Sequence, residues 1–237
     1  MSWGWSSPTR FLCNTPKTHA DMALTVTLLG GESSGKTALA QSLISTLERQ
    51  HGLHCALVDE GLRRWCNEYG RTPQAQEQIA IATQQSRCIE SAAQTLGADV
   101  VVADTTALMT AAYSEQYFQD TSLWPEALRL QATYSHTWLM GLDTPWQADG
   151  ALRDGPDARA TTDGLLRQRL NGAGLPYATL WGSLNERLSQ ALHALKQPLG
   201  LDLADGLARD HQRQWRCEHC TDPESEHRLF AYCTRSA

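Results

Sequence analysis

The residues that most clearly could carry chemistry are 30–37, which read Gly-Gly-Glu-Ser-Ser-Gly-Lys-Thr and satisfy the phosphate-loop pattern G-x-x-x-x-G-K-[ST]. Glycines in such a loop let main-chain N–H groups curl around phosphate oxygens. The Lys36 side chain would reach the terminal phosphates, and the Thr37 hydroxyl would ligate Mg²⁺. We therefore predict a phosphate-binding site whose residues are Gly30, Gly31, Glu32, Ser33, Ser34, Gly35, Lys36 and Thr37.

The segments on either side of this loop are those that the motif needs. Residues 24–30, LTVTLLG, are β-branched and apolar, which predicts a buried strand. A helix is expected from about residue 36 to residue 50, and its positive end would point at the bound anion. The alternative, a chance glycine turn, does not account for this strand-loop-helix order.

A carboxylate at residue 104 closes a second apolar segment. Residues 98–106 read ADVVVADTT, and their lack of alternation predicts a central strand of a parallel sheet. The carboxyl ends of such strands face the ligand crevice, so Asp104 would organise the metal or act on the substrate. The alternative is an ordinary aspartate in a strand-end turn.

Two further acids end another short strand, which is expected at residues 54–59. Asp59 and Glu60 would lie near the same crevice, where one carboxylate could hold or activate an acceptor hydroxyl. A solvated acidic turn explains them equally well.

The polar, glycine-rich residues 142–164 follow a strand expected at residues 136–143. They contain Arg153 and Arg159, so they would form a lid that excludes water and neutralises charge. Trp146 would stack on a planar ring or anchor the segment to the domain. A plain surface loop with solvated arginines is the alternative.

Strands and helices alternate from residue 24 to residue 196, which predicts an α/β fold with a doubly wound parallel sheet. The last strand is expected at residues 177–182. The remaining helical segments are expected at residues 74–97, 107–118, 124–133, 166–174 and 184–196. We predict three regions: a flexible leader at 1–23, a phosphate-binding domain at 24–197, and a small Cys/His-containing appendage at 198–237.

Composition narrows the range of partners. Hydrophobic residues make up 41% of the 237 residues, which supports a packed core, and the net charge is -6. Broad electrostatic binding to nucleic acid or to an anionic membrane is therefore not expected. No apolar run approaches the roughly 20 residues of a membrane helix. The seven cysteines are an odd number and mostly scattered, which favours reduced thiols and a cytoplasmic location.

Only the last three cysteines cluster. Cys217 and Cys220 have a spacing that lets both thiolates face one tetrahedral ion, so a structural Zn²⁺ is one interpretation. His227 and Cys233 would complete that site, with His219 as an alternative ligand. The other interpretations are a reduced tail and, less favoured, a redox pair.

Four stretches, LLGGESSGKTAL, LVDEGLRRW, VVVADTT and LDTPWQADGALR, together resemble a known family in their order and spacing. They are similar to the ribosylnicotinamide kinase domain of bacterial NadR proteins, within the NadR/Ttd14-type P-loop family. The resemblance extends over roughly residues 24–196. It implies a nucleoside-kinase-like P-loop fold, and ATP- and Mg²⁺-dependent phosphorylation of the ribose 5′-hydroxyl of nicotinamide riboside.

The resemblance also implies roles for single residues. Lys36, Asp104, Glu60 and Arg153 would be the catalytic residues, and Thr37 and Asp104 would hold Mg²⁺. Trp146, Asp149 and Arg63 would contact the substrate. The sequence departs from the family at Gly61, where an aromatic residue is usual, and at Gln84, where glycine is usual.

The sequence thus predicts a small-molecule kinase whose partners are ATP and a small riboside. A protein partner is not identified. The alternative is a nucleotide-binding regulatory ATPase module that uses residues 198–237 to dock a partner. A closed pocket beside the terminal phosphate would favour the kinase, and movable loops would favour the regulatory module.

Overall fold

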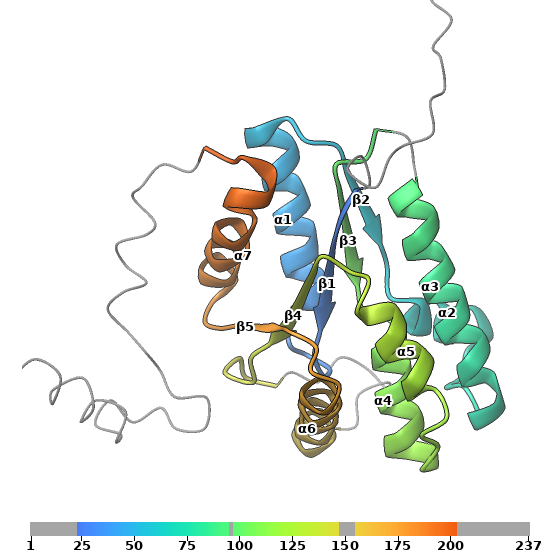
Figure 1. The fold of residues 1–237 in the computed structure, drawn as a ribbon. Coiled ribbons are helices and arrows are strands. Elements are labelled where there is room, and N and C mark those ends of the chain that lie inside the picture. The colour runs from blue at the N-terminus through green and yellow to red at the C-terminus, as the bar shows by residue number, and fades with distance from the viewer. Residues whose placement is uncertain (1–22, 95–96, 147–154, 203–237) are drawn as a thin grey trace, which may run out of the picture.

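The computed structural model describes residues 23–94, 97–146 and 155–202, and its centre is a five-stranded parallel sheet (Figure 1). The strand order is β2-β3-β1-β4-β5. The strands are β1 (Leu24–Leu29), β2 (Cys55–Val58), β3 (Val100–Asp104), β4 (His136–Met140) and β5 (Ala178–Leu180). Each predicted strand is present and each pairing is parallel, which confirms the predicted α/β class.

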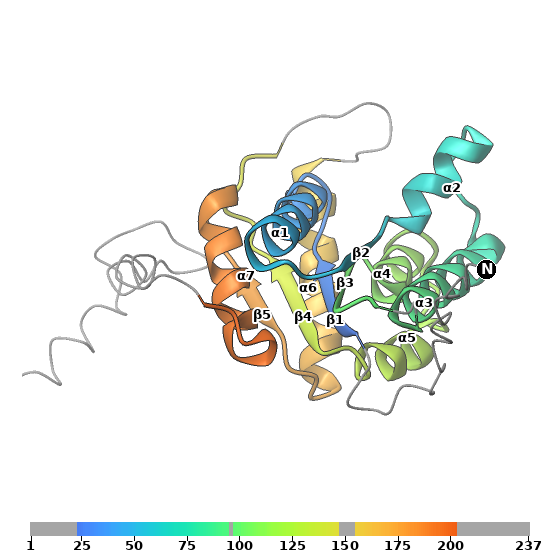
Figure 2. The same ribbon diagram turned by 90° about the horizontal axis from the view of Figure 1, so that it is seen from above.

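Helices cover both faces of the sheet (Figures 1 and 2). They are α1 (Lys36–His51), α2 (Gly61–Tyr69), α3 (Gln78–Gln94), α4 (Ala107–Phe118), α5 (Trp124–Gln131), α6 (Pro156–Gly172) and α7 (Leu184–Leu199). Helices α1 and α7 pack together on one face of the sheet. Helices α3 to α6 lie on the other face, where α4 contacts α3, α5 and α6.

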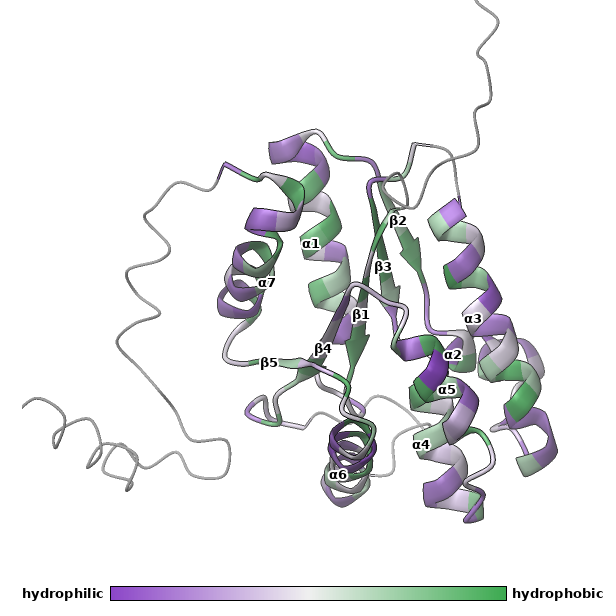
Figure 3. Cartoon of the chain, viewed as in Figure 1, coloured by the Kyte–Doolittle hydropathy of each residue, from purple (hydrophilic) through white to green (hydrophobic). Residues whose placement is uncertain are grey.

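The two central strands are the most deeply buried part of the molecule. All five residues of β3 are buried, as are five of the six residues of β1. Much of β2 and β3 is green, the colour of hydrophobic residues, in Figure 3. Apolar residues suit both faces of the sheet because both faces are covered by helices. A buried sheet of this kind holds in place the loops that follow the carboxyl ends of its strands.

The strand order creates a crevice at that end of the sheet. After β1 the chain crosses to β2 at one edge of the sheet, and after β3 it crosses past β1 to β4. These two connections run in opposite directions across the sheet, which opens a crevice at the carboxyl ends of the central strands. Leu28 is in register with Asp104 on one side and Trp138 on the other. Asp104 therefore lies level with the end of β1, directly beside the phosphate loop.

Two expectations about helices need correction. Helix α3 begins at Gln78 and not at residue 74, because the Gln74 N–H donates to the Glu77 carboxylate (2.7 Å) in a separate 3₁₀ turn at Ala75–Glu77. Helix α6 begins at Pro156, so the segment predicted as a loop at residues 142–164 is helical in its second part. Proline is well suited to the first turn of a helix, where its missing N–H costs nothing.

One further helix was not predicted from the sequence. Helix α2 was missed altogether, although it directly follows Glu60 at the end of β2. Among the described residues there is no helix long and apolar enough to cross a membrane.

Candidate active site

The phosphate loop joins β1 to α1 in a conformation that depends on glycine. Gly30 has φ +139°, and Gly35 has φ +81° at the N-terminus of α1. Gly31 has no room for a side chain, because a Cβ there would lie 2.8 Å from Cγ and 2.9 Å from the carbonyl oxygen of Arg159. The loop is thus packed directly against the first turn of α6.

Lys36 lies over this loop. Its side chain is buried, and Nζ donates to the carbonyl oxygens of Gly30 (2.8 Å) and Gly31 (3.0 Å). The Ser34 hydroxyl donates to the same Gly31 carbonyl (2.7 Å). The carbonyl groups of the loop are therefore turned toward the lysine and serine side chains, and a fixed ammonium group is held at the N-terminal end of α1.

Asp104 and Thr37 form the part of the site that suits a divalent cation. The Thr37 hydroxyl donates to Asp104 Oδ2 (2.5 Å). Asp104 is 2% exposed, and its other oxygen, Oδ1, has no hydrogen-bond partner among the described residues. A buried carboxylate oxygen without a partner is costly unless a cation or water satisfies it, so these two residues fit Mg²⁺. The described residues contain no larger cluster of metal-binding side chains.

A second buried cation supports the loop from α7. Arg187 is 2% exposed, and its guanidinium donates to the carbonyl oxygens of Ser34 (2.6 Å) and Gly141 (3.2 Å) and to Asp143 Oδ1 (2.8 Å). Asp143 in turn accepts from the Gly182 N–H after β5. One arginine thus ties the phosphate loop to the turns that follow β4 and β5.

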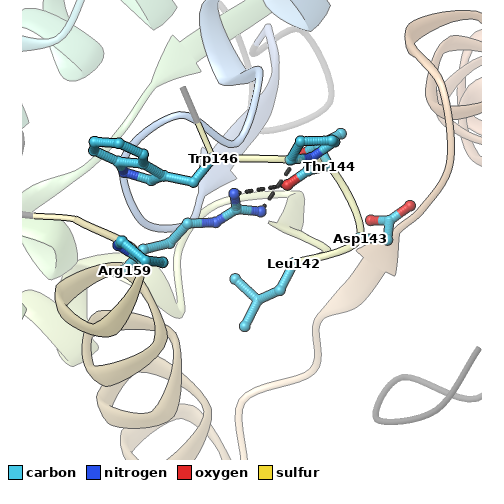
Figure 4. A pocket seen from close by; sticks show the side chains of 7 residues that line it. Leu142, Asp143, Thr144, Trp146 and Arg159 are labelled. Carbon is cyan, nitrogen blue, oxygen red and sulfur yellow. Dashed lines mark hydrogen bonds between the residues drawn. The ribbon is translucent and has the colours of Figure 1, made fainter. Parts of the chain in front are cut away.

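Arg159 and Trp146 line a pocket of about 290 Å³ beside the turn after β4 (Figure 4). The Arg159 guanidinium reaches from α6 to Thr144, where it donates to the carbonyl oxygen (2.8 Å) and to Oγ1 (3.2 Å). Burial lowers the pKa of Arg159, and the positive charge of Arg187 lowers it further. Arg159 is a buried residue of helix α6, which corrects both its expected place in a lid loop and the alternative of a solvated arginine in a surface loop.

Helix α2 follows β2, and helix α4 follows β3, on the side of the crevice nearest β2. Glu60 precedes the first residue of α2, and its carboxylate lies 3.3 Å from the Arg63 guanidinium. Burial raises the pKa of Tyr113 on α4, and the nearby carboxylates of Glu60 and Glu32 raise it further. Asp59 is exposed to solvent. The acidic group that faces this side is therefore Glu60, together with Glu32 from the phosphate loop.

Comparison with known proteins agrees with this geometry. A protein family described as "AAA domain" matches residues 25–187. The chain belongs to this family. The AAA-domain match spans the phosphate loop, all five strands and the first turn of α7. No curated protein sequence matches the chain.

Solved structures share the fold of this AAA domain. A NadR protein in complex with NR superposes with a TM-score of 0.65 at 18% identity, over 78% of this chain and 54% of NadR. The chain thus spans about half the length of that NadR protein. A thymidylate kinase from Ehrlichia chaffeensis superposes with a TM-score of 0.54 at 16% identity, over 73% of this chain and 98% of the kinase. A deoxyadenosine kinase from M. mycoides has a TM-score of 0.50 at 10% identity, over 73% and 100%. The P-loop fold expected from the NadR resemblance is confirmed.

The structure brings most of the predicted site residues together. Residues 30–37, Asp104 and Glu60 lie around the carboxyl ends of β1, β3 and β2, and Arg63 pairs with Glu60. Trp146 lies on the other side, in the pocket with Arg159. Arg153 and Asp149 lie outside the described residues, as do the proposed zinc ligands Cys217, Cys220, His227 and Cys233, so their roles stay predictions.

Sequence reasoning missed Arg187 and Tyr113 in this AAA domain. A signal for Arg187 was present, because it falls on the apolar stripe of the predicted helix, between Leu184 and Leu188. An arginine on a buried stripe needs hydrogen-bond partners inside the protein, so its position predicts a buried polar contact. Tyr113 has no comparable signal, since a tyrosine in an apolar helix is an ordinary core residue.

Proposed function

We propose that the protein is an ATP-dependent kinase that phosphorylates the 5′-hydroxyl of nicotinamide riboside or of a related riboside. The observation that carries the proposal is the Thr37–Asp104 pair, which lies beside a complete phosphate loop and has one buried carboxylate oxygen without a partner. The acceptor side supports it, because Glu60 lies at the next strand end.

In the proposed reaction, the main-chain N–H groups of the loop and the N-terminus of α1 hold the β- and γ-phosphates of ATP. The Lys36 ammonium exchanges its two carbonyl partners for phosphate oxygens, where it stabilises negative charge that spreads over the transferred group. Thr37 and Asp104 hold Mg²⁺, which neutralises charge on the phosphates when it is bound. Arg153 would add a second cation from the segment after β4.

Glu60 is proposed to orient the acceptor hydroxyl and accept its proton during transfer. Its side chain is 12% exposed, and the Arg63 guanidinium holds it at 3.3 Å. A carboxylate in such a place positions the attacking oxygen in line with the terminal phosphate. Arg63, Trp146 and Asp149 would contact the riboside. A cytoplasmic location is part of the proposal, and the free thiols of Cys55, Cys66 and Cys88 support it.

The test is ADP formation by the purified full-length chain with ATP, Mg²⁺ and a panel of ribosides that includes nicotinamide riboside. Each reaction is paired with the Asp104→Asn variant, which keeps the size of the side chain but removes its charge. We expect riboside-dependent ADP in the wild type, and a phosphorylated riboside by mass spectrometry. ADP formation that is unaffected by every riboside would contradict the proposal.

A further inference from the structure

A buried glutamine on α3 connects the two strand ends that carry the proposed catalytic carboxylates. Gln85 is 2% exposed. Its Oε1 accepts a hydrogen bond from the Gly61 N–H (2.8 Å), and its Nε2 donates to the Thr105 carbonyl oxygen (3.1 Å). Both partners are main-chain groups, and they belong to segments that directly follow β2 and β3.

The two partners are also the immediate neighbours of the two carboxylates. Gly61 follows Glu60, and Thr105 follows Asp104. One side-chain amide therefore sets the spacing between the main-chain segments from which the acceptor carboxylate and the metal-binding carboxylate project. The link is direct, because the Gln85 side chain itself makes both hydrogen bonds.

Thr105 has an unusual conformation that this link helps to fix. Its φ is +79°, a value that a β-branched residue rarely adopts. Such a conformation persists only where the surroundings determine it. Here the Thr105 N–H donates to the Leu28 carbonyl oxygen (3.1 Å) and its own carbonyl accepts from Gln85. The chain is thus held on both sides of Thr105, immediately after Asp104.

The link requires an amide at position 85 and a glycine at position 61. One side chain must accept from an N–H and donate to a carbonyl at once, which glutamine can do and glutamate or methionine cannot. At residue 61, a Cβ would lie 2.5 Å from Gln85 Oε1. The aromatic residue usual there in NadR-type kinases would therefore not fit beside Gln85 in this protein.

We propose that Gln85 is a positioning residue for phosphoryl transfer, which acts by holding Glu60 at a fixed position relative to Asp104. This inference rests on the proposed kinase function. Misplacement of a catalytic group by about 1 Å costs about a hundredfold in rate. The phosphate loop does not contact Gln85 through any hydrogen bond that the structure gives, so nucleotide binding should be spared.

The test compares two adjacent glutamines of α3, of which Gln85 is buried and Gln84 is exposed. We expect Gln85→Met to lower kcat with the riboside by about a hundredfold, while KM for ATP stays within about twofold. Gln84→Met should match the wild type. Gln85→Leu, which also removes both the acceptor and the donor, guards against a packing defect peculiar to the methionine variant and should show the same split.

Hydrogen exchange at the Gly61 amide gives a readout that needs no turnover. We expect exchange there to be at least about tenfold faster in Gln85→Met than in the wild type or in Gln84→Met. Unchanged exchange at Gly61 would overturn the inference. A fall in kcat matched by an equal fall in ATP affinity would also overturn it, since that is the result of a general structural defect.

The two proposals fail in different ways. A wild-type chain that phosphorylates no riboside would contradict the proposed function and, with it, any role of Gln85 in transfer. Riboside phosphorylation that is equally fast in the wild type and in Gln85→Met would leave the kinase function standing and overturn only the positioning role.

Discussion

The two sides of the crevice, which we propose bind the nucleotide and the acceptor, are built in different ways. On the nucleotide side, the charged groups Lys36, Asp104 and Arg187 are buried. Lys36 and Arg187 donate hydrogen bonds to main-chain carbonyl groups of the loop, and Asp104 accepts one from the Thr37 hydroxyl. On the acceptor side, α2 presents Arg63 with half of its side chain exposed, in a single ion pair with Glu60. The phosphate loop is held by buried charged groups, whereas the Glu60–Arg63 pair is partly open to solvent.

The aromatic contacts of α2 are also separate from the phosphate loop. Trp65 stacks on Tyr69 with ring centroids 4.5 Å apart, and the Arg71 guanidinium lies 4.8 Å from the centre of the Trp65 ring. These contacts are made within α2 and the turn that follows it. Substitutions in this helix should therefore change the surroundings of Glu60 without disturbing the phosphate loop.

The largest expected effect is on the nucleotide side. Lys36→Met removes the ammonium group that faces the phosphates, and we expect turnover to fall by about a thousandfold. Lys196→Met, at the far end of α7, is the matched control and should leave turnover unchanged. Activity of Lys36→Met close to that of the wild type would show that the loop does not handle the transferred phosphate.

The next effect tests whether buried cations hold the loop in place. Arg187→Lys keeps the charge but replaces the planar guanidinium, whose two nitrogens reach three partners, with a single ammonium, so we expect the free energy of unfolding to fall by about 3 kcal/mol. ATP affinity, measured by calorimetry, should fall as well because the Ser34 carbonyl loses its partner. The exposed control Arg129→Lys on α5 should cost less than about 0.5 kcal/mol. Equal costs for the two variants would show that the buried contacts of Arg187 do not hold the phosphate loop in place.

The nucleotide side is also the part that sequence predicts best. A glycine-rich loop between an apolar strand and a helix has little conformational freedom, so its pattern fixes the placement of Lys36 and Thr37. Asp104 was predictable for a similar reason, since a non-alternating apolar strand must be central and its end must face the crevice.

The acceptor side could not be predicted to the same depth. Only Asp59 and Glu60 separate α2 from β2, and the sequence of α2, GLRRWCNEY, begins with glycine and has few aliphatic residues. Its place is set by packing against α3, which depends on residues far along the chain. The buried links at Gln85 and Arg187 are equally non-local, because each joins segments that only the folded sheet brings together.

A smaller effect is expected at the acceptor carboxylate. Glu60→Gln keeps the size of the side chain but cannot accept a proton, so we expect kcat to fall by about a hundredfold with KM for ATP unchanged. The neighbouring Asp59→Asn is the matched control, since Asp59 is exposed and should not affect transfer. If Asp59→Asn proved the more damaging variant, the assignment of the acceptor carboxylate would have to be reversed.

The smallest expected effect lies beyond the end of α2, at the surface pair between Arg71 and Glu77 (2.7 Å). The hydrogen bond from Arg71, together with one from the Gln74 N–H, lowers the pKa of Glu77 from its ordinary 4.5 to about 2. Because the folded state has the lower pKa, the pair stabilises the fold above about pH 4.5, and this contribution is lost as the pH falls toward about 2.

Arg71→Gln removes the main cause of that shift, so the Glu77 pKa in a carboxylate NMR titration should rise toward 4.5. Turnover and ATP affinity should stay at wild-type values, because Arg71 belongs to the turn beyond α2 and contacts neither carboxylate of the crevice. A change in ATP affinity in this variant would mean that the acceptor helix and the phosphate loop are coupled, and that the two sides are not independent.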